Sequence, residues 1–128
     1  MSAIERVLTP NAPKPAGHYS QAIAYGDLIF VSGQLPVTLD GKIAADESFE
    51  EQARLALANL LAIVRAAGSS PDRVLKVTVF LAGVEYWPKF NEIYAEAFGE
   101  ARPARSVVPV PALHYGALVE IEAIASRA

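Results

Sequence analysis

The sequence predicts an α+β fold in which a mixed β-sheet carries two helices packed on one of its faces. Two observations lead to this fold class. Short runs rich in β-branched residues indicate strands, and two longer segments repeat their apolar residues at helical spacing. Along the 128 residues these segments follow one another in the order β-β-α-β-α-β-β. The length suits a single domain spanning residues 1–128, because domains commonly contain ~100–150 residues.

The N-terminal part is predicted to form a loop followed by a β-hairpin. Residues 9–17 contain three prolines and should be extended, because proline restricts φ and lacks a backbone donor. Apolar runs at residues 21–25 and 28–31 indicate two strands. The Gly26-Asp27 pair between them is typical of a tight turn, which predicts that the two strands pair with each other.

Two helices are predicted from the spacing of apolar residues. The first begins at Ser48, which forms a capping-box pattern with Glu51, and ends at Gly68. The second carries an aromatic stripe and ends at Gly99. The stripe of the first helix comprises Ala53, Ala56, Leu57, Leu60, Ile63, Val64 and Ala67, and that of the second comprises Trp87, Phe90, Tyr94, Ala97 and Phe98.

Three further strands complete the predicted sheet, at residues 74–81, 105–110 and 118–126. In the last strand one set of alternating side chains is apolar and suits a face beneath the helices. The other set mixes apolar side chains with Glu120 and Glu122. The sheet is apolar on both faces, but the two predicted helices can cover only one of them. The uncovered apolar face predicts that the chain forms an oligomer.

The composition excludes several classes of site. The chain has no cysteine, so it forms neither a disulfide nor a thiolate nucleophile nor a cysteine-ligated metal centre. Its two histidines lie far apart in the sequence, which predicts no histidine-built metal site but leaves carboxylate ligands open. The glycines fit neither GxGxxG nor the Walker pattern, so no nucleotide cofactor is expected.

Charge and hydropathy argue against nucleic acid and membrane as partners. The net charge is −3 and the isoelectric point is about 5.3, whereas a non-specific nucleic-acid binder needs clustered Lys and Arg. The longest apolar run, residues 60–64, is far shorter than the ~20 residues of a membrane span. The first residues lack the apolar stretch of a signal peptide, so we expect a cytoplasmic protein.

Glu120, Glu122 and Arg105 are the first candidates for chemistry. The two carboxylates should lie on one strand face, ~7 Å apart, and repel each other unless a cation lies nearby. Arg105 opens a neighbouring predicted strand and is the cation expected there. One interpretation is that Arg105 forms a cross-strand salt bridge with the two glutamates. The other makes Arg105 a clamp for a substrate carboxylate, with Glu120 as general base or water-positioning group.

The remaining polar candidates carry less information. Ser32 and Gly33 follow a strand and offer a hydroxyl and backbone N–H groups, yet an ordinary turn explains them equally well. No His/Asp pair accompanies Ser32, so a hydrolase triad is not supported. Asn91 lies on the second helix, where it is placed to face a pocket. His18 and His114 lie in loops and are expected to be solvent-exposed.

Taken in order, these segments resemble the Rid family, also called the YjgF or L-PSP family. The resemblance covers nearly the whole chain and depends on the ordered series rather than on any one motif. The motifs are GHYSQA at residues 17–22, VSGQLP at 31–36, Gln52-Ala53, VTVF at 77–80, FNEIY at 90–94, PARS at 103–106 and VEIEAIA at 119–125.

The resemblance implies a chorismate-mutase-like fold assembled as a homotrimer, with sites in the clefts between subunits. It implies cofactor-independent hydrolysis of reactive enamines and imines, such as 2-aminoacrylate, to a 2-keto acid and ammonia. Arg105 would then hold the substrate carboxylate and Glu120 would position water. By similarity, Tyr19, Ser32, Gly33 and Asn91 would line the same cleft.

Departures from the family pattern suggest a substrate other than that of the housekeeping deaminases. His18 stands where proline is common, and Val107 stands where many deaminating members have cysteine. Pro109, Pro111 and the His114-Tyr115-Gly116 loop are expected to reshape the cleft edge. An imine released by an amino-acid oxidase and an aminomuconate-type enamine are two candidates.

Two other functions are compatible with the same resemblance. The first is a regulatory trimer that binds keto acids in the cleft without turning them over. The second is the endoribonuclease or translation-inhibitor activity attributed to some relatives, which the acidic isoelectric point and the lack of a basic aromatic patch disfavour.

Overall fold

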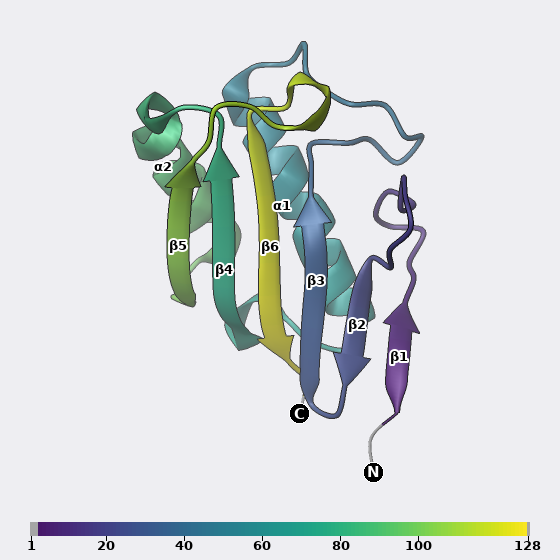
Figure 1. The fold of residues 1–128 in the computed structure, drawn as a ribbon. Coiled ribbons are helices and arrows are strands. Elements are labelled where there is room, and N and C mark those ends of the chain that lie inside the picture. The colour runs from purple at the N-terminus through teal and green to yellow at the C-terminus, as the bar shows by residue number, and fades with distance from the viewer. Residues whose placement is uncertain (1–2, 128) are drawn as a thin grey trace.

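The computed structural model describes residues 3–127 and contains one six-stranded sheet with two helices on one side (Figure 1). The strands are β1 (Ile4–Val7), β2 (Ala22–Tyr25), β3 (Leu28–Gln34), β4 (Val74–Leu81), β5 (Ala104–Pro109) and β6 (Val119–Ser126). The helices are α1 (Phe49–Ala66) and α2 (Trp87–Phe98), and short 3-10 turns form η1 (Pro71–Arg73), η2 (Val84–Tyr86) and η3 (His114–Gly116).

The sheet is mixed, as the sequence predicts. Its strand order is β1-β2-β3-β6-β4-β5, and β4 and β5 form the parallel pair while the other neighbours are antiparallel. Helix α2 makes the crossover that a parallel pair requires. The last strand of the chain therefore lies in the middle of the sheet, between β3 and β4.

Strand β1 has no counterpart in the sequence-based prediction. It is a four-residue edge strand with exposed side chains, so it lacks the apolar alternation by which a strand is found. It pairs antiparallel with β2. Its Glu5 carboxylate accepts two hydrogen bonds from the Arg127 guanidinium, each 3.2 Å long, and so ties the edge to the C-terminal end of β6.

Both helices begin and end close to their predicted positions. Ser48 caps α1, where its hydroxyl accepts a hydrogen bond of 3.2 Å from the backbone N–H of Glu51. The Glu51 carboxylate accepts from Arg54. After α1, Gly68 has φ +91°, and Gly99 at the end of α2 has φ +62°; glycine reaches these left-handed angles at little cost.

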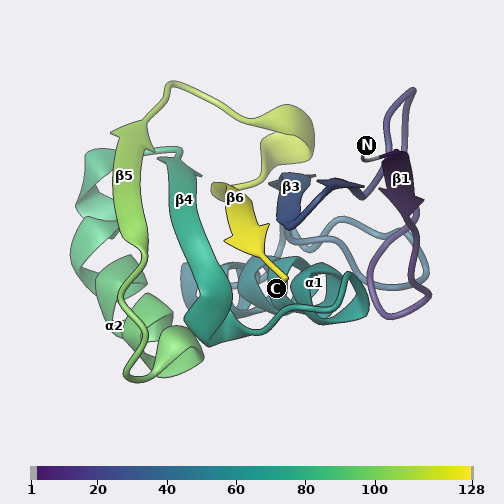
Figure 2. The same ribbon diagram turned by 90° about the horizontal axis from the view of Figure 1, so that it is seen from below.

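The helices cover one face of the sheet (Figure 2). In β6, the side chains predicted to lie beneath the helices are all buried; they are Val119, Ile121, Ala123 and Ala125. Phe90 of α2 and Leu60 of α1 are fully buried in the same hydrophobic core. The opposite face carries apolar side chains that this chain leaves partly exposed, among them Leu28, Phe30 and Val108. Within residues 3–127 no helix has the length and hydropathy needed to cross a membrane.

Candidate functional site

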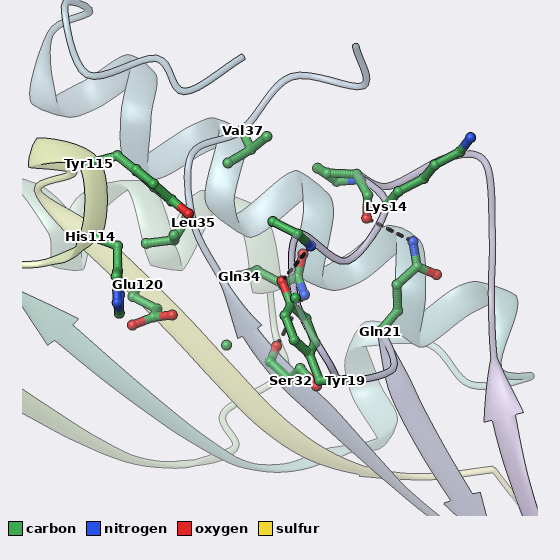
Figure 3. A pocket seen from close by; sticks show the side chains of 14 residues that line it. Lys14, Tyr19, Gln21, Ser32, Gln34, Leu35, Val37, His114, Tyr115 and Glu120 are labelled. Carbon is green, nitrogen blue, oxygen red and sulfur yellow. Dashed lines mark hydrogen bonds between the residues drawn. The ribbon is translucent and has the colours of Figure 1, made fainter. Parts of the chain in front are cut away.

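A pocket of about 360 Å³ lies at the end of the sheet where β3 ends and β6 begins (Figure 3). Its walls come from the N-terminal loop, the end of β3 with the segment after it, η3 and the start of β6. They are formed by Pro13, Lys14, Ala16, Gly17, Tyr19, Gln21, Ser32, Gly33, Gln34, Leu35, Val37, His114, Tyr115 and Glu120. Four of the predicted site residues, Tyr19, Ser32, Gly33 and Glu120, are thereby brought together. We call this site the β3–β6 pocket.

An irregularity in β3 forms the floor of the pocket. The pairing of β3 with β6 shifts register between Val31 and Gln34, so Ser32 and Gly33 fall in the bulge. The Ser32 hydroxyl donates to the carbonyl of Ser20 at 2.6 Å, and its backbone N–H donates to the carbonyl of Gln21 at 3.0 Å. The Ser32 hydroxyl therefore fixes the loop against the strand.

Glu120 lies directly against Gly33. A Cβ added at position 33 would lie 2.6 Å from Oε2 of Glu120, which is closer than a Cβ approaches any atom in real structures. The glycine therefore serves a close approach between a carboxylate and the backbone. Burial raises the pKa of Glu120 above its usual range, the positive charge of His114 opposes the rise, and the nearby Glu122 carboxylate adds to it.

The N-terminal loop is held over the pocket by a buried glutamine. The Gln21 amide accepts a hydrogen bond from the backbone N–H of Thr9 at 2.7 Å and donates to the carbonyls of Thr9 and Pro13 at 3.1 and 2.9 Å. The proline-rich segment forms the predicted loop and packs in place through these bonds, but it is not extended throughout, because the chain turns at residues 10–11 and bends at residues 12 and 16–17. The Tyr19 hydroxyl accepts from the backbone N–H of Ala16 at 3.2 Å, which leaves the tyrosine ring half-exposed at the rim.

Arg105 lies away from this pocket. On β5 it pairs with Val77 of β4, whose buried side chain faces the helices. Its guanidinium lies 4.6 Å from the ring centroid of Tyr94 and 5.9 Å from that of Trp87, both on α2. Burial raises the pKa of the Tyr94 hydroxyl to about 12, although Arg105 acts in the opposite direction.

The predicted cross-strand salt bridge between Arg105 and the two glutamates is therefore wrong within one chain. Strand β4 separates β5 from β6, and Glu120 pairs with Phe80, whose side chain lies on the face opposite that of Val77. Successive side chains along a strand point to opposite faces of the sheet, and Val77 and Phe80 are three residues apart, so Arg105 and Glu120 face away from each other. The chain order alone suggested adjacent strands and did not reveal that β4 comes between them.

Asn91 does not line the β3–β6 pocket but lies on α2, the helix whose Trp87 and Tyr94 rings face Arg105. It lies one helical turn after Trp87 on α2 and is partly buried. The predicted site residues of one chain thus lie in separate places. One group lines the β3–β6 pocket, and Arg105 lies apart from it against the Trp87 and Tyr94 rings of α2. Val107 lies on the same face of β5 as Arg105.

Two pocket residues were missed in the sequence, whereas His114 and Tyr115 were expected at the cleft edge because they depart from the family pattern, and both line the pocket. Gln21 and Lys14 line the pocket, yet no local pattern distinguishes them from other loop residues. His18 and His114 both looked like exposed loop histidines, and both are exposed. Only His114 lines the pocket, because η3 folds over the start of β6. Among residues 3–127, no group of three or more His, Asp and Glu side chains is arranged to hold a metal ion.

Comparison with known proteins places these features in a family. A sequence model described as endoribonuclease L-PSP matches residues 9–127. The chain belongs to the Rid (YjgF/L-PSP) family. Its predicted membership and its α+β fold are both confirmed.

Relatives cover the whole Rid domain of this chain. The RutC family protein PH0854 of Pyrococcus horikoshii is 46% identical over 96% of this chain and 98% of its own length. A Dermatophagoides farinae protein named 2-iminobutanoate/2-iminopropanoate deaminase is 36% identical over 97% of each chain. The crystal structure of E. coli TdcF with bound serine superimposes with a TM-score of 0.91 at 39% identity, covering 97% of this chain and 99% of TdcF.

Proposed function

We propose that this Rid protein is a cytoplasmic enzyme that hydrolyses reactive 2-enamino and 2-imino acids to 2-keto acids and ammonia without a cofactor. The observation that carries the proposal is the half-buried Glu120 carboxylate, held against the backbone of Gly33 inside a pocket of substrate size. The named activity of the D. farinae relative supports the same reaction class.

We further propose that the enzyme works as a homotrimer with each site between two subunits. Arg105 and Glu120 face away from each other in one chain, so a substrate of a few carbon atoms cannot contact both there. A neighbouring chain supplies the missing arginine when its Arg105 edge packs beside the β3–β6 pocket. The partly exposed apolar side chains on the open face, Leu28, Phe30 and Val108, favour such packing.

The proposed reaction begins with the substrate carboxylate paired to the Arg105 guanidinium, which offers two parallel N–H donors. Glu120 orients a water molecule and accepts one of its protons as the oxygen bonds to the imine carbon. The proton passes to nitrogen and yields a carbinolamine. Glu120 then passes the hydroxyl proton to the amino nitrogen, the C–N bond breaks, and ammonia and the ketone are released with Glu120 ionised again.

The raised pKa of Glu120 suits this role. A carboxylate with a pKa above the ordinary value is a stronger base at neutral pH and gives its proton back more slowly to bulk water. Imines hydrolyse spontaneously, so positioning and general-base assistance of roughly 10²–10⁴-fold each suffice for a useful enzyme.

The physiological substrate belongs to this proposal as well. The pocket wall carries His114 and Tyr115, and Val107 lies two residues after Arg105 on the same face of β5, so three of the residues that depart from the family pattern lie at the β3–β6 pocket or beside Arg105. We propose an imine released by an amino-acid oxidase or an aminomuconate-type enamine rather than 2-aminoacrylate alone. Activity confined to small imines such as 2-iminopropionate would contradict this choice.

A panel assay tests the reaction and its substrate range together. Amino-acid oxidases or a dehydratase generate different imines in situ, and keto-acid release is followed with and without the protein. We expect acceleration with the wild-type protein and none with Arg105→Ala. Equal rates for the two proteins would remove Arg105 from the mechanism.

The second candidate function is saturable ligand binding without turnover. It is supported by the structurally similar TdcF, whose crystal structure contains bound serine. A keto acid that binds with no acceleration of any imine in the panel would favour it. RNA cleavage, which the family description suggests, has little support from a chain of net charge −3.

A further inference from the structure

The short turn η3 holds two side chains at the mouth of the β3–β6 pocket. Tyr115 has φ +62°, a left-handed angle that a residue with a Cβ seldom adopts, and Gly116 follows with φ +76°. One hydrogen bond closes the turn across this kink, and a second one holds the chain after it against α1. The backbone N–H of Ala117 donates to the carbonyl of His114 at 3.2 Å, and that of Leu118 donates to Oε1 of Gln52 in α1 at 2.9 Å.

The kink places His114 over Glu120. Both side chains line the pocket, and Figure 3 shows the imidazole next to the carboxylate, close enough for the two charges to act on each other. The backbone of Gly33 closes the other side of the carboxylate. Glu120 therefore lies between the backbone of Gly33 on one side and the imidazole of His114 on the other.

We propose that His114 is a positioning residue for Glu120, whose cationic imidazole keeps the carboxylate ionised and turned into the pocket. The catalytic consequence rests on the proposed function above, whereas the pairing of the two side chains does not. A histidine is cationic in the acidic range where a carboxyl group titrates, so its charge favours the ionised carboxylate there. The same charge reduces the repulsion between Glu120 and an incoming substrate carboxylate.

Other titratable groups lie around Glu120, and the test must separate their effect on its titration from that of His114. Lys14 and Tyr19 reach the pocket from the N-terminal loop, and Tyr115 from η3. Glu122 lies on the same face of β6 and acts against His114. Removing His114 and removing Glu122 should therefore move the titration of Glu120 in opposite directions.

The experiment is a carboxyl ¹³C NMR titration of protein labelled at glutamate, with the Glu120 signal assigned through Glu120→Gln. We expect His114→Gln to raise the pKa of Glu120 and Glu122→Gln to lower it. His18→Gln is the matched control, because His18 is exposed and lies outside the pocket lining, and it should leave the titration unchanged. Backbone amide spectra of each variant verify that it is folded.

The kinetic counterpart is the pH profile of kcat/KM on an imine from the panel assay. We expect His114→Gln to lose kcat/KM in acid, with a loss that grows as the pH falls, because removing a nearby positive charge leaves less of the Glu120 carboxylate ionised there. At alkaline pH, where the carboxyl group is ionised in both proteins, the loss should vanish.

An unchanged Glu120 titration in His114→Gln overturns the inference, whatever the activity. A loss of kcat/KM that is equal at every pH, with the titration unchanged, means that His114 contacts substrate instead. If no protein of the series turns over any imine, the proposed function fails, while the titration still decides the pairing of His114 with Glu120.

Discussion

Gly33 and Glu120 are in such close contact that any side chain at position 33 would displace the carboxylate. A Cβ there would also lie 3.1 Å from Cδ and 3.3 Å from Cγ of Glu120, so the whole end of the side chain must move. The two residues come from adjacent strands, so the backbone of β3 at Gly33 lies against the side chain of the proposed base, Glu120 of β6. Because of this contact, even Gly33→Ala, which adds a single methyl group, should move the Glu120 carboxylate.

Gly33→Ala should lower kcat/KM on imines by about 10- to 100-fold, the range expected when a general base is misplaced. Stability should change little, because the displaced group is the flexible end of a side chain. The check is a double-mutant cycle with Glu120→Gln. If both changes act on the same group, the double variant is no slower than Glu120→Gln alone, whereas additive losses would show that Gly33 acts elsewhere.

Mixing two impaired variants should restore activity if Arg105 and Glu120 reach the substrate from different chains. Arg105→Ala is expected to be inactive, and Glu120→Gln is expected to keep only a small residual rate. Co-expressed in equal amounts as trimers, they should recover about one quarter of the wild-type rate, because chance pairing gives that fraction of sites both intact side chains. No recovery in a mixed oligomer of verified mass would mean that both residues act from one chain.

Glu120→Gln should stabilise the protein at neutral pH and lose this advantage in acid. The folded state holds Glu120 with a raised pKa, so between the unfolded and folded pKa values it binds more protons than the unfolded state. Stability therefore falls as pH rises through this window. We expect a Tm gain of roughly 1–2 °C at pH 7 and none near pH 4, measured by thermal unfolding at constant salt. An equal gain at both pH values would assign the effect to packing.

Arg127→Gln should loosen β1 without unfolding the sheet. Arg127 holds Glu5 by two hydrogen bonds and donates from Nε to the carbonyl of Gly26 at 3.0 Å. Amide hydrogen exchange in residues 4–7 should accelerate up to about tenfold, while exchange in β4 and β6 stays unchanged. Hydrogen bonding to Arg127 lowers the pKa of Glu5, so the wild-type protection should itself weaken as pH falls through that lowered pKa. Uniform acceleration across the sheet would mean that the ion pair supports the whole fold.

Local patterns account for most of the fold. The helices were predictable because their caps and apolar stripes lie within a few turns of chain, as Ser48 and the residues up to Gly68 illustrate. The faces of β6 were predictable because side chains alternate along any strand. Strand β1 was not, because an exposed four-residue edge carries no apolar period and is held by partners distant in the sequence.

The candidate site likewise has features that local sequence predicts and features that only long-range packing sets. The sequence by itself determined which residue types are available for chemistry, and the ordered motifs indicated Tyr19, Ser32, Gly33, Asn91, Arg105 and Glu120. Only the tertiary structure decided which of them meet. Strand order is set by long-range pairing, and β4 comes between β5 and β6, so Arg105 and Glu120 occupy opposite faces. The same long-range packing brought His114, whose loop was expected only at the cleft edge, to the pocket of Glu120.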